Sequence, residues 1–109
     1  MRTKIKSALL LIFFMSKNLI ADDYEVTICQ LQAGNQDRVF LAPCEAWGTK
    51  NSCPGINWLT WELNSNGAKA MYSTALAALT SGTKIKVRVS EEAGDCAHYD
   101  TTLMIRIIK

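Results

Sequence analysis

The chain has 109 residues, of which 49% are apolar and 20% are charged, values typical of one small globular domain. This composition disfavours a disordered chain and leaves no room for a second domain. Four of the 12 basic residues lie before residue 22, so eight basic and ten acidic residues follow it. The resulting net charge of −2 disfavours a nucleic-acid-binding protein.

Residues 1–21 have the order of regions found in a secretory signal peptide. Basic residues precede the apolar run Ala8–Met15, and a short polar segment ending in Ala21 follows it. Eight apolar residues span about 12 Å as a helix, much less than the roughly 30 Å of a hydrocarbon core, which disfavours a membrane anchor. We therefore predict a signal peptide over 1–21, a single secreted or periplasmic domain over 22–109, and no membrane span after signal removal.

Four cysteines follow this segment: Cys29, Cys44, Cys53 and Cys96. Paired thiols persist in the oxidising compartment that export would reach, and an even count predicts two disulfides. No two of these cysteines are spaced as C-x-x-C, and the single histidine is His98, so no metal site is expected. Four cysteines allow three pairings.

The first structured part of the domain is predicted to be a hairpin. Residues 24–31 and 38–42 are rich in β-branched and apolar side chains and flank turn-forming residues 33–37. With the turn centred near Gln36, Cys29 and Cys44 come opposite each other across the two strands, within disulfide distance. The hairpin therefore favours Cys29–Cys44 and leaves Cys53 to pair with Cys96.

The segment after the hairpin, 45–55, contains glycines, a proline and short polar residues, which predicts a loop. Trp47 lies in it with three hydrogen-bonding residues, Thr49, Lys50 and Asn51. A flat apolar ring beside such groups suits a shallow sugar site, so these four are our candidate ligand-binding residues. The alternative is that Trp47 folds over the hairpin as a lid on the core.

The remaining pattern predicts a strand, one helix and two further strands. A strand over 56–63 would place Trp58 and Trp61 on opposite faces, one in the core and the other covered by the helix or an interface. Apolar residues at helical spacing predict a helix over 68–79, which Gly82 caps. Strict alternation predicts a strand over 83–90, with a basic outer face, and apolar residues predict the last strand over 102–108. The order is β-β-β-α-β-β.

No pattern in the chain predicts catalysis. His98 and Asp100 share a polar loop, where a solvated histidine is commoner than a general base, and neither G-x-S-x-G nor a phosphate-binding glycine loop occurs. The basic row of Lys84, Lys86 and Arg88 has two interpretations. It is either the solvent-exposed side of a strand or a surface that binds an acidic partner. We expect a non-catalytic binding module without a cofactor, for a glycan or a protein. The alternative is a structural or inhibitory envelope protein that binds a partner through an edge strand.

The order of these elements resembles that of oligomer-binding-fold (OB-fold) domains, small five-stranded barrels with one helix after the third strand. A secreted, disulfide-bonded domain of this kind resembles the B subunits of AB5 toxins, of the subtilase-cytotoxin and pertussis-like type. Residues 70–85 and Gly94-Asp95-Cys96 also resemble small exported bacterial proteins of unknown function. The resemblance implies a mainly β, OB-fold-like barrel with one helix. The toxin likeness further implies a ring of five subunits that recognises glycans and carries a separate catalytic subunit.

Overall fold

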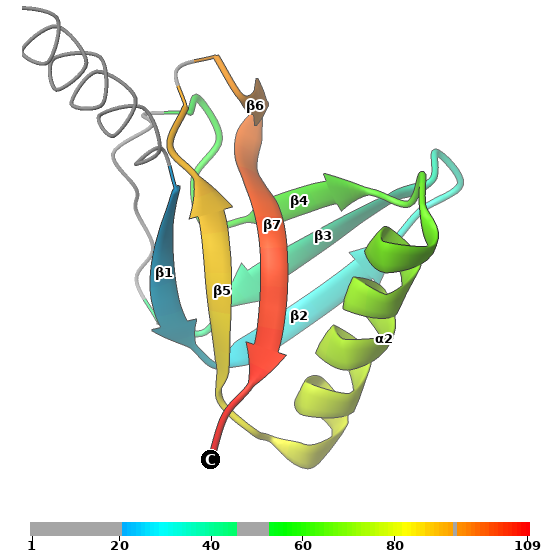
Figure 1. Cartoon of the computed structure of the whole chain (residues 1–109), viewed down its shortest axis with the longest axis vertical. Coiled ribbons are helices and arrows are strands. Elements are labelled where there is room, and N and C mark those ends of the chain that lie inside the picture. The colour runs from blue at the N-terminus through cyan, green and yellow to red at the C-terminus, as the bar shows by residue number, and fades with distance from the viewer. Residues whose placement is uncertain (1–20, 46–52, 93) are drawn as a thin grey trace, which may run out of the picture.

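The computed structural model describes residues 21–45, 53–92 and 94–109 (Figure 1). Its elements are β1 (Ala21–Val26), β2 (Ile28–Ala33), β3 (Arg38–Pro43), β4 (Leu59–Glu62), α2 (Asn66–Ser81), β5 (Ile85–Ser90), β6 (Cys96–Ala97) and β7 (Tyr99–Ile107). The protein is mainly β with one helix in the described ranges, as the sequence predicts. The predicted signal peptide, apart from Ala21, and the loop residues Trp47, Thr49, Lys50 and Asn51 lie outside the described residues.

The strands form a hydrogen-bonded path in the order β1-β5-β7-β4-β3-β2, and β6 pairs with β7 beside that path. The neighbours are antiparallel except β4 and β7, which are parallel. Figure 1 shows β1, β5 and β7 running across the direction of β2, β3 and β4, with α2 along one side. Because β7 pairs with both β4 and β5, it joins the two groups of strands.

The structure corrects the predicted five-stranded barrel. The predicted strand 24–31 is two strands, β1 and β2, which Thr27 separates and which pair with β5 and β3 respectively. The short β6 adds another strand inside the segment predicted as a polar loop. The path therefore holds six strands with β6 beside it, and no closed five-stranded barrel is formed. β-branched and apolar residues run through the break at Thr27, so the pattern gave no sign of it.

The boundaries of two other predicted strands also differ. The strand predicted over 56–63 is shorter, because β4 begins only at Leu59 and Asn57 has a left-handed backbone with a φ of 71°. A strand needs an extended backbone, so the chain cannot pair through Asn57. The last strand is longer than predicted and begins at Tyr99, directly after His98, which is also left-handed with a φ of 70°.

The predicted helix is confirmed, and the structure extends it to α2, Asn66–Ser81. Ser65 is the N-cap, and its Oγ accepts a hydrogen bond from the Ala68 N–H at 3.0 Å. Gly82 ends the helix in a left-handed conformation with a φ of 69°, as predicted. The helix packs on β2 and β7, and Ala75 and Ala78 let it approach the core closely.

The core lies between the strands and α2. Ile85, Val87 and Val89 of β5 are completely buried, which confirms the alternation predicted there. Trp61 is also buried, and its Nε1 donates to the Ala68 carbonyl of α2 at 3.0 Å. Trp61 is therefore the core member of the predicted tryptophan pair. Within the described part of the chain, no helix is long and apolar enough to cross a membrane.

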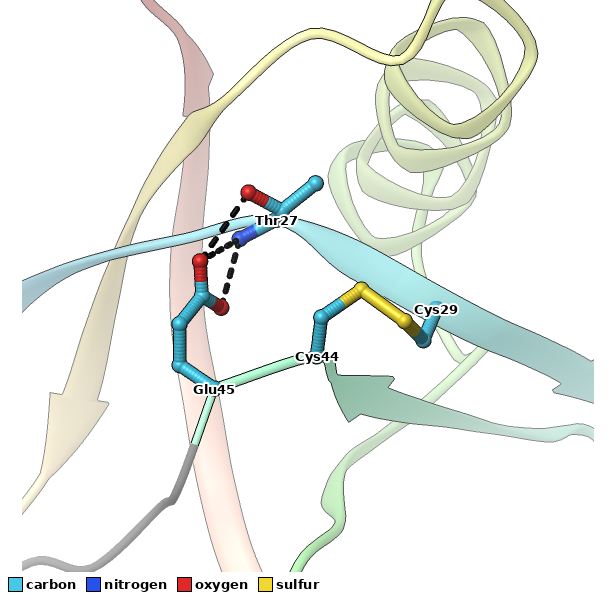
Figure 2. Close-up of a disulfide and its surroundings, with 4 residues drawn as sticks. All are labelled: Thr27, Cys29, Cys44 and Glu45. Atoms are coloured by element: carbon cyan, nitrogen blue, oxygen red, sulfur yellow. Dashed lines mark hydrogen bonds between the residues drawn. A yellow bond between two sulfur atoms is a disulfide. The ribbon is translucent and has the colours of Figure 1, made fainter.

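Both predicted disulfides are present. Cys29 and Cys44 join β2 to the end of β3 with their Cα atoms 4.9 Å apart (Figure 2). Cys53 and Cys96 are 5.8 Å apart and tie the segment before β4 to β6. The hairpin interpretation was therefore correct for the pairing, even though the first strand of the hairpin begins later than predicted.

Candidate binding site

The face of β2, β3, β4 and β7 that points away from the core carries the candidate site. On β3, Val39 and Leu41 are completely buried, so the alternating residues Arg38 and Phe40 lie on the opposite face. The pairing register places one residue of each strand in a row across this face: Gln32, Phe40, Thr60 and Thr101. Polar and aromatic side chains thus meet on a surface built by four strands.

An aromatic cluster occupies one part of this face. The Phe40 ring lies edge-on to Trp58, with centroids 6.5 Å apart, and edge-on to Tyr99, with centroids 5.9 Å apart. These are favourable arrangements of aromatic rings. Together with Gln32 they line a hollow of about 270 Å³, which we call the aromatic hollow. All three rings remain partly exposed, so a ligand can reach them.

Unusual backbone conformations orient two of these rings. Asn57 and His98, two of the three non-glycine residues with a left-handed backbone among the described residues, directly precede Trp58 and Tyr99. Left-handed residues other than glycine are uncommon, and such strained positions concentrate at functional sites. The two segments are also joined by a hydrogen bond from the Gly55 N–H to the His98 carbonyl at 2.5 Å. The backbone conformation and this hydrogen bond help to hold both Trp58 and Tyr99 against Phe40.

Gly55 is required by the packing of the cluster. A Cβ atom at this position would overlap the Tyr99 ring and the His98 side chain. The His98 ring itself lies edge-on to Tyr99 at 4.8 Å between centroids. The Cys53–Cys96 disulfide binds these same two segments two residues away from Gly55 and His98. The site is therefore supported by covalent, hydrogen-bonded and steric constraints together.

A second, polar hollow of about 330 Å³ lies on the same face; we call it the polar hollow. Its lining is Arg38, Trp61, Glu62, Asn64, Gly94, Asp95, Cys96, Ala97 and Thr101. Arg38 forms an ion pair with Glu62, with Nη2 and Oε1 2.9 Å apart, and its Nη1 donates to Thr60 Oγ1 at 3.2 Å. Thr101 Oγ1 donates to Asp95 Oδ1 at 3.0 Å. The hollow thus presents donors and acceptors that are already held in place.

The two groups considered for catalysis lie in different environments. His98 is exposed and packs against Tyr99, whereas Asp100 is buried, with 4% of its surface exposed. The described residues also contain no group of three His, Cys, Asp or Glu side chains that could hold a metal ion. What the arrangement provides is a fixed aromatic and polar surface suited to binding.

The basic row on β5 faces an acidic partner strand. Arg88 Nε donates to Asp23 Oδ1 of β1 at 2.8 Å, and this hydrogen bond lowers the pKa of Asp23 and raises the pKa of Arg88. Glu25 lies opposite Lys86 in the register of the two strands. The row is therefore partly neutralised within the sheet, which weakens its candidacy as a surface for an acidic partner.

Sequence reasoning missed most of the aromatic cluster. The sequence patterns place Phe40 in a strand and Tyr99 in a polar loop, and they leave open which of Trp58 and Trp61 lies in the core. The alternation of residues 38–41 does place Phe40 opposite the core, so this signal was available. The proximity of Tyr99 depends on the parallel pairing of β4 with β7, which no local pattern contains. No protein-family model matches this chain, and no curated protein matches it by sequence.

Proposed function

We propose that this protein is a secreted, non-catalytic carbohydrate-binding module that holds a sugar ring in the aromatic hollow. The observation that carries the proposal is the hollow itself, which three aromatic rings, Phe40, Trp58 and Tyr99, line together with the amide side chain of Gln32. A sugar offers an apolar C–H face to aromatic rings and hydroxyl groups to an amide, and small-ligand sites combine these same two kinds of surface. The net charge of −2 after residue 21 argues against the alternative of a stacked nucleic acid.

The strand order supports an OB-like fold for this module. If β1 and β2 are counted as one strand bent at Thr27, and β6 is set aside, five strands remain with the helix after the third. Both ends of the hydrogen-bonded path then belong to that first bent strand. OB-folds bind oligosaccharides and oligonucleotides on the face of their second and third strands and on adjoining loops. By this count those strands are β3 and β4, which carry the aromatic hollow and the polar hollow.

The two disulfides support a secreted or periplasmic location for the proposed module. Disulfides persist in oxidising compartments and are rare in the cytosol. They also suit a small domain, whose core alone gives limited stability. The proposal therefore keeps the location that the leader-like residues 1–21 predict.

The test is binding of the oxidised protein, exported through its own leader, to a glycan array. We expect selective binding, and we expect Trp58→Ala and Tyr99→Ala to weaken it at least tenfold, because each removes a ring from the hollow. Leu76→Ala is a matched control, since Leu76 is an exposed apolar residue on α2, outside both hollows. An array without binding to the folded protein, or equal binding by all three variants, contradicts the proposal.

A further inference from the structure

The aromatic hollow and the polar hollow are neighbours on one face. On β3, Phe40 lines the first and Arg38 lines the second; on β7, Tyr99 lines the first and Thr101 the second. In both strands the two residues are two positions apart, which places them on the same face about 7 Å from each other. Because Phe40 and Thr101 lie in one row through Thr60, the boundary between the hollows runs obliquely: it crosses β3 beyond this row and β7 before it.

The Thr60 hydroxyl between the two hollows already has its hydrogen-bond partners within the protein. Thr60 lies at this boundary and is completely buried. Its hydroxyl donates to the Val39 carbonyl at 2.7 Å and accepts from Arg38 at 3.2 Å. A ligand can therefore extend from one hollow to the other without losing a hydrogen bond at Thr60.

The polar hollow suits a neutral, hydroxyl-rich group. The ion pair between Arg38 and Glu62 sets a donor and an acceptor side by side, and a sugar hydroxyl can donate to the carboxylate and accept from the guanidinium. A carboxylate or sulfate on the ligand would gain from Arg38 but would be repelled by Glu62 and by Asp95. The aromatic hollow has no charged side chain in its lining. Both hollows thus favour an uncharged ligand.

We infer that the polar hollow is a second subsite for the same ligand, and that this ligand is a neutral oligosaccharide of at least two sugar units. One ring lies against Phe40, Trp58 and Tyr99, and the adjacent ring lies between Arg38 and Glu62. The inference rests on the proposed function, because it presumes that the aromatic hollow binds a sugar.

The test is calorimetric titration with methyl glycosides of glucose, galactose and mannose and with the corresponding disaccharides cellobiose, lactose and mannobiose. For at least one pair, we expect the disaccharide to bind about tenfold more tightly than the methyl glycoside, as hydrogen bonds to charged groups at the second ring would give. Glu62→Gln and Asn64→Ala should remove most of that tenfold difference and leave binding of the methyl glycoside unchanged. Phe40→Ala should weaken the binding of both the methyl glycoside and the disaccharide.

Gln30→Ala is the matched control, because Gln30 is exposed on β2 and lines neither hollow. Thermal melts confirm that each variant is folded. Equal affinity for disaccharide and methyl glycoside, or a disaccharide preference that both Glu62→Gln and Asn64→Ala leave intact, overturns the second subsite while the proposed function stands. If neither member of any pair binds and the array also shows no binding, the proposed function fails first.

Discussion

The hydroxyl of Thr102 is an exception among the buried polar groups of the described residues. Thr102 is 4% exposed, and its Oγ1 has no hydrogen-bond partner. The hydroxyl lost its contacts with water on folding and gained no replacement. A buried polar group in this state lowers stability, and removing it without changing the shape of the side chain relieves the penalty.

We therefore expect Thr102→Val to increase the free energy of unfolding by about 1 kcal/mol. Thr60→Val is the matched control: Thr60 is also buried, but its hydroxyl makes two hydrogen bonds, so the same change should lower stability by about 1–3 kcal/mol. Urea unfolding of both variants measures the difference. Equal destabilisation by the two substitutions would show that Thr102 is satisfied in solution.

Glu45 compensates for the break between β1 and β2. Its carboxylate accepts the Thr27 N–H at 2.9 Å and 3.2 Å and the Thr27 hydroxyl at 3.0 Å (Figure 2). The backbone hydrogen bond from Thr27 is the main reason why the pKa of Glu45 lies below its ordinary value. The N–H that the strand break leaves without a ladder partner is thus bonded to an anion.

Because the pKa of Glu45 is lowered by folding, the stability of the protein depends on pH. Because the folded-state pKa of Glu45 is below the unfolded-state value of about 4.3, its contribution is present above that pH and is lost as the pH falls through the folded-state pKa. Glu45→Gln should therefore be less stable than the wild type at pH 7, and the difference should shrink as the pH falls towards 2. Urea unfolding of both proteins across this pH range measures the difference in free energy of unfolding. A difference that stays constant with pH would show that ionised Glu45 is not its source.

At the scale of elements, α2 is the part that local sequence determines most completely. Helical spacing of apolar residues, Ser65 before the first turn and Gly82 after the last all act through neighbours close in the chain. The strand β5 is similar, because its strict alternation defines which face is buried. In contrast, the division between β1 and β2 is visible only in their pairing, because β1 pairs with β5 and β2 pairs with β3. No residue between Tyr24 and Leu31 breaks the strand pattern.

The N-cap of α2 can be tested with a pair of identical substitutions. Ser65→Ala removes the hydrogen bond to the Ala68 N–H and should lower the free energy of unfolding by about 1 kcal/mol. Ser73→Ala, in the middle of the same helix, should be neutral or slightly stabilising, because the exposed Ser73 hydroxyl only bonds back to the Lys69 carbonyl. Thermal unfolding of both variants gives the comparison. Equal losses would mean that Ser65 is not the effective cap.

For the whole molecule, the two disulfides have different roles. Cys29–Cys44 spans 15 residues and secures the β2–β3 hairpin, whereas Cys53–Cys96 spans 43 residues and joins the two segments that carry Trp58 and Tyr99. In the chain-entropy model, closing these loops stabilises the fold by about 3 and about 4 kcal/mol respectively. The second bond thus constrains the segments that carry two of the three rings of the aromatic hollow.

We expect the double variant Cys53→Ala, Cys96→Ala to be the less stable of the two double variants and to lose most of the proposed glycan binding. The variant Cys29→Ala, Cys44→Ala should lose about 3 kcal/mol of stability but, at a temperature where it stays folded, should bind as the wild type does. Thermal melts and array binding of the two variants measure both effects. Equal binding by both would show that the Cys53–Cys96 bond does not position the site.

The amino-acid sequence by itself determined the features that depend on nearby residues: the helix and its caps, the alternating strand β5, and a hairpin tight enough to predict Cys29–Cys44. With four cysteines, that pair also determined the second disulfide. Tertiary structure alone decided the break between β1 and β2 at Thr27, the pairing of Asp23 with Arg88, and the meeting of Phe40, Trp58 and Tyr99. These contacts join residues far apart in the chain, and strand pairing between distant segments leaves no local periodicity by which a sequence could reveal it.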